Sequence, residues 1–185
     1  MRDKIIEEAV KLFNVYNFKF KLDDIAKNLH ISKKTIYKYF DSKEDIFKAF
    51  ILDGFDSMRQ GQEKIMVDDR LSTKMKLTAL LNTRCSYESK FSMDKAIEIR
   101  DYYPEMTKLV LESYSSQWKN VDTLLTKGKE EKVFSDEYPN NLIIEMLSHA
   151  IFMVHERGFL RKNHLTYRRA IAESVAIIIE GISIK

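Results

Sequence analysis

The chain is poor in the residues that interrupt helices and that cross-link secreted domains. Only five of its 185 residues are glycine, two are proline and one is cysteine. A single cysteine excludes an intrachain disulfide, and the scarcity of glycine and proline disfavours a fold with many tight turns. The sequence has no apolar run long enough to cross a bilayer, and its first residues carry acids where a signal peptide needs an apolar segment. We therefore expect a soluble, cytoplasmic protein with no membrane partner.

The abundant residues are typical of helices. Hydrophobic residues make up 44% of the chain and charged residues 32%. The apolar residues recur at intervals of three and four, as they do on one face of a helix. We therefore predict an all-α fold. The expected helices span about 2–16, 22–29, 33–40, 43–61, 70–89, 93–101, 104–130, 138–158 and 164–183.

The net charge of +3 is unevenly distributed along the chain. Residues 1–50 contain eleven Lys and Arg but only eight Asp and Glu, so they carry the whole positive excess. The remaining 135 residues are balanced. A basic excess indicates contact with nucleic acid only where it coincides with a suitable motif.

Such a motif lies at residues 22–43, LDDIAKNLHISKKTIYKYFDSK. Its pattern predicts a helix-turn-helix, in which a first helix braces a second through apolar residues such as Ile25. A short turn follows, and Ser32 is a suitable N-cap for the second helix. Ile36 and Phe40 give the second helix one apolar face, so its N-terminal end can present side chains to base edges.

Polar side chains of this segment predict two kinds of DNA contact. Lysine can donate to guanine O6 and N7, threonine can contact a thymine methyl group or a phosphate, and tyrosine can bind phosphates. Considered alone, the tyrosines would be assigned to core packing. We expect base-edge contacts from Ser32, Lys33, Lys34 and Thr35, and phosphate contacts from Tyr37, Tyr39 and Lys43.

Residues 5–52 resemble the N-terminal domain of TetR-family transcriptional regulators. The resemblance rests on IIEEAVKLF and on FKFKLDDIAKNLHISKKTIYKYFDSKEDIFKAF. It implies that the third helix reads the major groove, and it moves Thr35 to the group of backbone contacts. Three residues depart from the family pattern. Asn17 and His30 replace glycines, and Lys21 replaces a capping threonine but can keep a DNA phosphate contact.

The same resemblance implies the organisation and function of the whole chain. Residues 1–45 would form a three-helix DNA-binding domain, and residues 46–185 a helical ligand-binding and dimerisation domain, linked by the helix at about 43–61. The implied protein is a homodimeric repressor that binds double-stranded DNA at a near-palindromic operator and is released by a small-molecule effector of unknown identity. The alternative is an architectural or non-inducible dimeric DNA-binding protein without a ligand.

The last two expected helices are apolar on more than one face. A surface helix needs only one apolar stripe, so the extra face indicates a second partner. We predict a two-fold homodimer through a four-helix bundle. A terminal helix buried within one chain is the alternative. The predicted interface comprises Leu147, Ala150, Ile151, Val154, Val175, Ile178, Ile179 and Ile182.

Large aromatic and polar residues in the second domain are candidates for a small-molecule pocket, because such sites are mostly apolar with a few polar groups. Aromatic residues at helical spacing are more often ordinary core, so each candidate competes with that explanation. The predicted pocket residues are Arg84, Tyr87, Arg100, Tyr103, Trp118, Phe152 and His155.

The sequence disfavours catalysis and metal binding. No motif brings Cys85 together with a histidine, and no glycine-rich phosphate loop is present. His149 and His155 are six residues apart, which does not place them on one helix face as a metal pair requires. We expect no catalytic residue, no metal and no cofactor. A redox role for Cys85 stays open.

Overall fold

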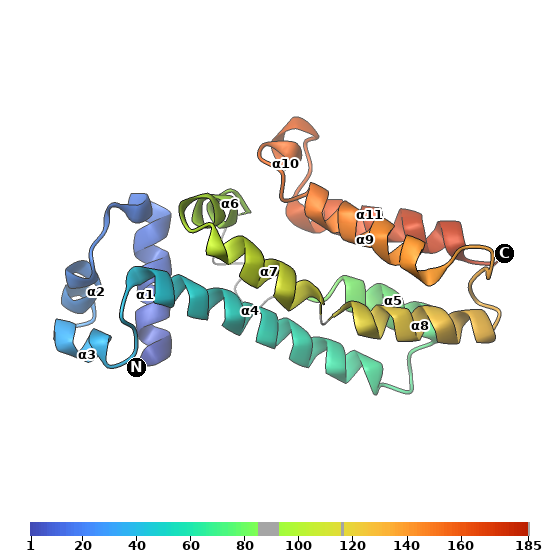
Figure 1. Cartoon of the computed structure of the whole chain (residues 1–185), viewed down its shortest axis with the longest axis horizontal. Helices are drawn as coiled ribbons and strands as arrows, with labels where there is room; N and C mark the ends of the chain where they lie inside the picture. Colours follow the sequence, from blue (N-terminus) through green and yellow to red (C-terminus); the bar gives the residue numbers. More distant parts are fainter. Residues whose placement is uncertain (85–92, 116, 185) are drawn as a thin grey trace. The chain divides into compact units, whose positions relative to one another are not determined.

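The computed structural model of the chain describes residues 1–84, 93–115 and 117–184 (Figure 1). Within those ranges the regular structure is helical, and it contains no strand apart from an isolated antiparallel bridge between Phe134 and Ser183. The all-α fold predicted from apolar periodicity is therefore confirmed. None of the described helices combines the length and the apolarity needed to cross a bilayer.

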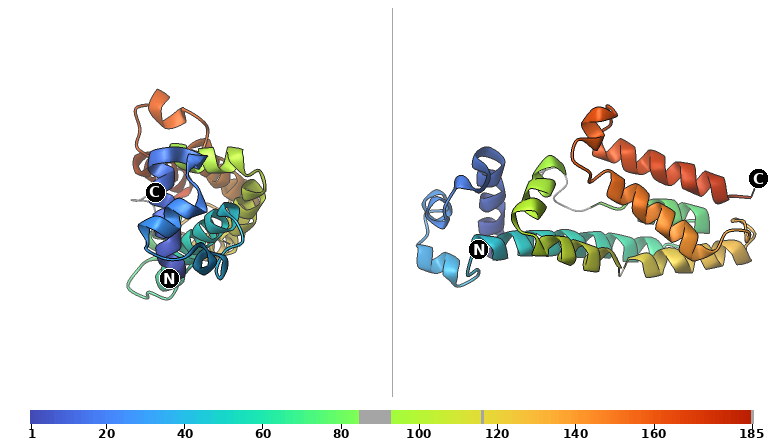
Figure 2. Two further views of the ribbon diagram at one scale, coloured as in Figure 1. Left: turned by 90° about the vertical axis from the view of Figure 1, so that its left-hand side faces the viewer. Right: turned by 45° about the horizontal axis from the view of Figure 1, so that its top comes forward.

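The chain divides into two compact units. The first, called the N-terminal unit below, comprises the described residues 1–56 and 93–110. Figures 1 and 2 show α1, α2 and α3 together at the start of the chain. The unit contains α1 (Arg2–Tyr16), the 3-10 helix η1 (Asn17–Lys19), α2 (Leu22–Asn28), α3 (Lys33–Tyr37), the first part of α4 (Lys43–Met66), α6 (Met93–Tyr102) and the first part of α7 (Glu105–Ser115).

The core of the N-terminal unit is rich in aromatic rings. Phe13 and Phe47 are fully buried, with ring centroids 5.2 Å apart in an edge-to-face arrangement. Phe18 lies beside both of these rings. Ile25 of α2 and Ile36 of α3 are also fully buried, so the two short helices are held by the same core.

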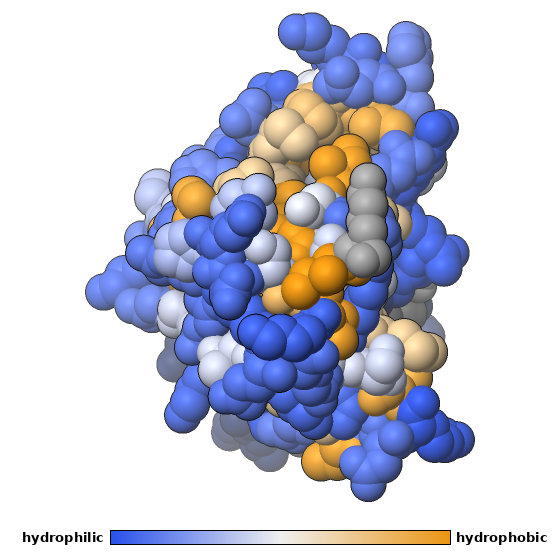
Figure 3. All heavy atoms as spheres, turned by 90° about the vertical axis from the view of Figure 1, so that its right-hand side faces the viewer, coloured by the Kyte–Doolittle hydropathy of each residue, from blue (hydrophilic) through white to orange (hydrophobic). Residues whose placement is uncertain are grey.

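The second compact unit, called the C-terminal unit, comprises the described residues 57–84, 111–115 and 117–184. It contains the rest of α4 and α7 together with α5 (Thr73–Leu81), α8 (Trp118–Glu130), α9 (Asn140–Met153), α10 (Phe159–Lys162) and α11 (Tyr167–Ile182). Helix α8 packs against α5 and α9, and α11 packs against α9 and α5. Some hydrophobic side chains remain exposed, and Figure 3 shows hydrophobic atoms gathered among hydrophilic ones on one face.

The helix predicted over 104–130 is wrong as a single element. Helix α7 ends at Ser115 and α8 begins at Trp118. The Ser115 hydroxyl donates to the carbonyl of Glu112 at 2.7 Å, and such local bonding competes with helix continuation. The short helix α10 was also missed, and α5 ends well before residue 89.

The compact units do not divide at residue 45, where the resemblance places the boundary of the DNA-binding domain. The units divide within α4, between Asp56 and Ser57, so that helix contributes to both. Helix α6, which follows much of the C-terminal unit in sequence, belongs to the N-terminal unit. A single boundary in the sequence therefore cannot separate the two units. The functional boundary at 45 stays a prediction.

Candidate nucleic-acid interface

Helix α3 is a short helix with a defined start and a buried face. The Ser32 hydroxyl accepts a hydrogen bond from the Thr35 backbone N–H at 3.1 Å, which is the N-cap geometry expected from the sequence. The hydroxyls of Ser32 and Thr35 also lie 2.9 Å apart. Ile36 and Phe40 are buried, at 0% and 6% exposure. These contacts fix which side of α3 faces solvent.

The outer side of α3 and the turn after it carry the predicted DNA contacts. Lys33 and Lys34 are exposed at the first turn of the helix. Tyr37 and Tyr39 are 48% and 47% exposed, so core packing does not explain these two rings. Exposed lysine ammonium groups and tyrosine hydroxyls are groups that bind phosphates and base edges.

Lys33 has an acidic partner in the preceding helix. Its ammonium lies 2.9 Å from the carboxylate of Asp23 in α2, and both side chains are largely exposed. The hydrogen bond to Asp23 raises the pKa of Lys33 above its ordinary value. Asp23 was not among the residues predicted to act at the interface. Its position ten residues before Lys33 has no helical periodicity that would have indicated the pairing.

Lys43 contacts backbone of its own chain. Its ammonium donates to the carbonyls of Phe18 and Phe20, each at 2.8 Å, and lies 4.7 Å from the centre of the Phe20 ring. Burial lowers the pKa of this group. Two of its three N–H donors therefore hold the segment between α1 and α2, and the third is the one that a phosphate could take.

Lys21, at the start of α2, is exposed, as a phosphate contact requires. The sequence lacks a capping hydroxyl at this position, and Asp24 supplies the capping interaction instead. The Asp24 carboxylate accepts the Lys21 backbone N–H at 2.6 Å. This bond satisfies one backbone donor and places a negative charge in the first turn, where the helix dipole favours it.

The two positions where the sequence departs from glycine do adopt glycine-like backbone. Asn17, after α1, and His30, between α2 and α3, both have a φ of 52°. Asparagine and histidine tolerate positive φ better than most residues. The turns are therefore retained at a cost in backbone strain.

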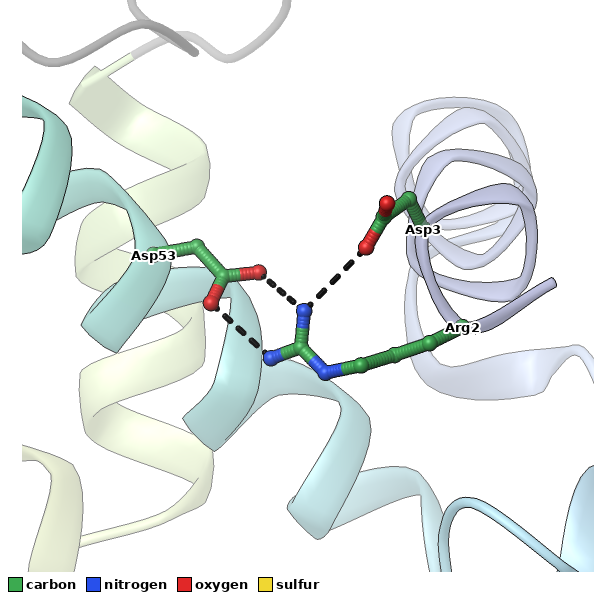
Figure 4. A network of polar contacts seen from close by, with 3 residues as sticks. All are labelled: Arg2, Asp3 and Asp53. Carbon is green, nitrogen blue, oxygen red and sulfur yellow. Dashed lines mark hydrogen bonds and ion pairs between the residues drawn. The ribbon is translucent and has the colours of Figure 1, made fainter.

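Arg2 ties the first helix to the fourth (Figure 4). Its guanidinium donates to both carboxylate oxygens of Asp53, at 2.6 and 2.9 Å, and to Asp3 at 3.2 Å. A two-pronged Arg–carboxylate pair fixes orientation as well as distance. The hydrogen bond to Asp53 raises the pKa of Arg2. This pair orients α1 on α4 within the N-terminal unit.

Helix α6 is also joined to α1 and η1. Lys95 donates to the side-chain oxygen of Asn17, and its ammonium lies 5.0 Å from the centre of the Phe13 ring. The rings of Phe18 and Tyr102 stack with centroids 3.9 Å apart. Burial raises the pKa of the neighbouring Tyr103 to about 12. The sequence did not indicate this group of contacts.

The predicted pocket residues belong to both compact units. Arg100 and Tyr103 belong to the N-terminal unit, where Arg100 pairs with Asp101 and Tyr103 packs against Phe47. Tyr87 lies outside the described residues. The remaining four belong to the C-terminal unit: Arg84, which is exposed, and Trp118, Phe152 and His155, which are partly buried.

Two of these four lie in a series of rings. Phe152 is 5.7 Å from Tyr114 and 6.3 Å from His155, and His155 is 5.7 Å from Tyr167. The C-terminal unit also buries two amides, because Gln62 donates to the side-chain oxygen of Gln117 and to the Leu80 carbonyl, both at 3.3 Å. The rings are of the kind that lines small-molecule sites, whereas the amides form hydrogen bonds within the core of the unit.

Most of the predicted dimer residues are internal to one chain. The extra apolar faces of α9 and α11 pack against each other and against α8 and α5, which explains them without a second chain. Leu147, Ile151, Val154, Val175, Ile179 and Ile182 are buried in the core of the C-terminal unit, and Ala150 and Ile178 are partly buried. The exposed large apolar residues of these two helices are Leu142, Met146 and Ile177.

Comparison with protein families supports the interpretation of the N-terminal segment. Residues 5–50 match the family of bacterial regulatory proteins called tetR. The chain is 24% identical over 184 residues to the uncharacterised HTH-type transcriptional regulator YvaF of Bacillus subtilis strain 168, covering 99% of this chain and 96% of that protein.

Two further similarities extend the comparison. The HTH-type negative transcriptional regulator IcaR of a Staphylococcus aureus (strain Newman) biofilm operon is 42% identical over 57 residues, which are 30% of this chain and 31% of that protein. Among solved structures, the SmeT–triclosan complex superposes with a TM-score of 0.72 at 13% identity, covering 100% of this chain and 92% of the other. This structural likeness concerns the fold.

Proposed function

We propose that this chain, which belongs to the tetR family of bacterial regulatory proteins, represses transcription as a homodimer that a small molecule releases from a near-palindromic operator. Membership of the family makes the chain a transcriptional regulator, and the family is not one of enzymes. IcaR, which resembles this chain over 57 residues, is a negative regulator, which favours repression.

The observation that carries the DNA-binding part is the exposed side of α3. A helix held by Ile36 and Phe40 presents Lys33 and Lys34 in its first turn, and Tyr37 follows on its exposed side. In a helix-turn-helix the N-terminal residues of the second helix meet base edges, whereas flanking groups bind the backbone. We assign base contacts to the lysines and phosphate contacts to the tyrosines.

The dimer is proposed from the exposed apolar residues of α9 and α11. Leu142 and Met146 are 48% and 52% exposed and lie four residues apart, on one face of α9. Ile177 of α11 is 73% exposed. A second copy of the chain would cover these residues. Two copies would also present two α3 helices to half-sites about one DNA turn apart.

Release by a ligand is proposed to act through α4. This helix is continuous from Lys43 to Met66. Asp53, which holds Arg2, and Gln62, which lies in the core of the C-terminal unit, are on the same helix nine residues apart. A ligand that binds beside the rings and amides of the C-terminal unit and shifts α4 would move the support of α1. Binding to two half-sites would then weaken, because the ligand favours a different arrangement of the two DNA-binding units, one from each chain and called heads below.

The proposal is tested by selecting bound DNA from a random pool and then screening small molecules on the selected complex. We expect a near-palindromic site with half-sites about one helical turn apart.

Lys34→Ala should change the preferred base at one position of each half-site. Tyr37→Phe should weaken binding to all sequences about equally. Sedimentation of Met146→Glu should show a weakened dimer.

Each part of the proposal has its own contradicting result. A pool that yields no preferred sequence would overturn operator recognition. A wild-type chain that sediments as a monomer at micromolar concentration would overturn the dimer. Tight operator binding that no small molecule reduces would favour the non-inducible alternative.

A further inference from the structure

The two lysines at the start of α3 have different surroundings. The Lys33 ammonium lies 2.9 Å from the Asp23 carboxylate. Lys34 is exposed, and no ion pair to it is found in the part of the chain that the structure describes. A surface that must approach DNA phosphates therefore carries a carboxylate beside one of its base-reading cations.

Stability gives Asp23 a small role, because an exposed acid in the first turn of α2 interacts favourably with the helix dipole. The Lys33 and Asp23 side chains are 45% and 60% exposed, and ion pairs with such exposure contribute little to folding. Capping of α2 does not require Asp23 either, because the neighbouring Asp24 accepts the Lys21 backbone N–H. A negative charge at this place should reduce affinity for any DNA.

We propose that Asp23 is a specificity-determining residue, which withholds Lys33 from the phosphates of non-operator DNA. This inference rests on the proposed function. On arbitrary DNA, Lys33 exchanges one anionic partner, the Asp23 carboxylate, for another, a phosphate, and gains little. At the operator, Lys33 reaches guanine O6 and N7, two aligned acceptors that only the correct base pair offers. Asp23 therefore lowers non-specific affinity more than operator affinity.

The experiment compares wild type with Asp23→Asn in full-length protein, on the selected operator and on a scrambled duplex of equal length, over a series of salt concentrations. Freed Lys33 should contact one more phosphate per head on the scrambled duplex. The slope of log affinity against log salt then steepens by about 0.9 per head. Non-specific affinity should rise by roughly tenfold for two heads. Operator affinity should rise less, so the specificity ratio falls.

Two controls separate this effect from a general change of charge. Glu173→Gln removes one negative charge from an exposed ion pair with Arg169 on α11, and it should leave both slopes as in wild type. In a Lys33→Ala background, Asp23→Asn should no longer change the slope, because the cation that it would release is absent. The thermal midpoint of each variant establishes that it is folded.

The outcomes distinguish this inference from the proposed function. If wild type selects no sequence at all, both fail. If wild type selects an operator but Asp23→Asn leaves the non-specific slope unchanged, the role of Asp23 is overturned and the proposed function stands. It is also overturned if operator and non-specific affinities rise by the same factor, or if the slope still changes without Lys33.

Discussion

In the N-terminal unit, aromatic rings and charged side chains join helices that are distant in sequence, whereas the C-terminal unit is packed chiefly from aliphatic side chains. The buried core of the first unit includes five phenylalanines, and that of the second includes one, Phe134, among the described residues. Arg2, Lys43 and Lys95 each make directed contacts across the first unit.

The two kinds of core differ in how strictly they fix the orientation of the helices. Ring pairs and two-pronged ion pairs have preferred geometries, so they fix the orientation of α1, α4 and α6 within the N-terminal unit. Aliphatic cores accept changes of side chain more readily if their volume is kept. We therefore expect the N-terminal unit to be sensitive to the shape of its core residues, and the C-terminal unit to tolerate repacking.

The largest expected effect comes from Phe47. Its ring is fully buried and lies beside Phe13, Phe18 and Tyr103, so Phe47→Ala should lower the free energy of unfolding by about 3–5 kcal/mol. Leu147→Ala, in the other core, should cost about 2–5 kcal/mol. Urea denaturation of each variant measures these losses.

Conservative replacements make the same comparison sharper. Leu147→Met keeps the side-chain volume and should cost less than about 1.5 kcal/mol. Phe47→Leu loses the ring contacts and should cost more than that. Equal costs for the two conservative variants would contradict the proposed difference between the cores.

A glycine tests how tightly the C-terminal unit is packed at one point. A Cβ at Gly128 would lie 2.2 Å from the Phe134 ring, so Gly128→Ala should destabilise by about 1–3 kcal/mol. Gly181→Ala is the matched control, because nothing lies within 4 Å of its added Cβ, and it should be neutral or stabilising. Thermal denaturation of both variants provides the measurement. If Gly128→Ala is not destabilising, the core of the C-terminal unit can rearrange around Phe134.

Tyr103 gives the aromatic unit a dependence on alkaline pH. Its pKa is raised from 10.0 to about 12, mainly by burial. Above pH 10 the unfolded chain loses this proton while the folded chain keeps it, so stability is full below pH 10 and falls as pH rises through about 12. Because the ring is only partly buried, we expect a loss below about 1 kcal/mol.

Tyr103→Phe should remove that part of the alkaline loss, as measured by urea denaturation at neutral and alkaline pH. Tyr102→Phe, at the exposed neighbouring ring, is the control. The burial explanation fails if both variants show the same pH dependence as wild type.

The smallest expected effect is at His30. Its φ of 52° costs a histidine about 1–2 kcal/mol relative to glycine, whereas glycine costs about 0.5–1 kcal/mol more unfolded-chain entropy. His30→Gly should therefore stabilise the chain by less than about 1 kcal/mol and leave operator affinity unchanged. A clear loss of stability would indicate that the His30 side chain has a role beyond filling the turn.

The features that could be predicted from the sequence are those that depend on residues close together in the chain. The Ser32 cap and the buried Ile36 follow from local chemistry and from helical spacing, and both occur in the structure. The pairs Arg2–Asp53 and Lys95–Asn17 join residues 51 and 78 positions apart, so they exist only once the helices have packed. Nothing in the local pattern around these residues distinguishes them from other surface charges.

The second apolar face of α9 and α11 shows what apolar periodicity leaves open. Apolar periodicity reports that a face is covered, but not whether the cover belongs to the same chain. Here α5 and α8 supply cover for residues such as Leu147 and Val175. Leu142 and Met146 of α9 remain exposed, so they are residues that a second chain could cover.

The continuity of α4 constrains how the units of two related proteins can be combined in one chain. Each residue of an α-helix turns its successor by about 100°. One residue inserted between Asp53 and Gln62 would rotate the face that holds Arg2 by that angle relative to the face that enters the C-terminal core. Seven inserted residues, close to two full turns, would nearly restore the phase. A chimaera that joins this N-terminal unit to the C-terminal unit of another protein must therefore be spliced in helical phase, whatever the similarity of the two sequences at the junction.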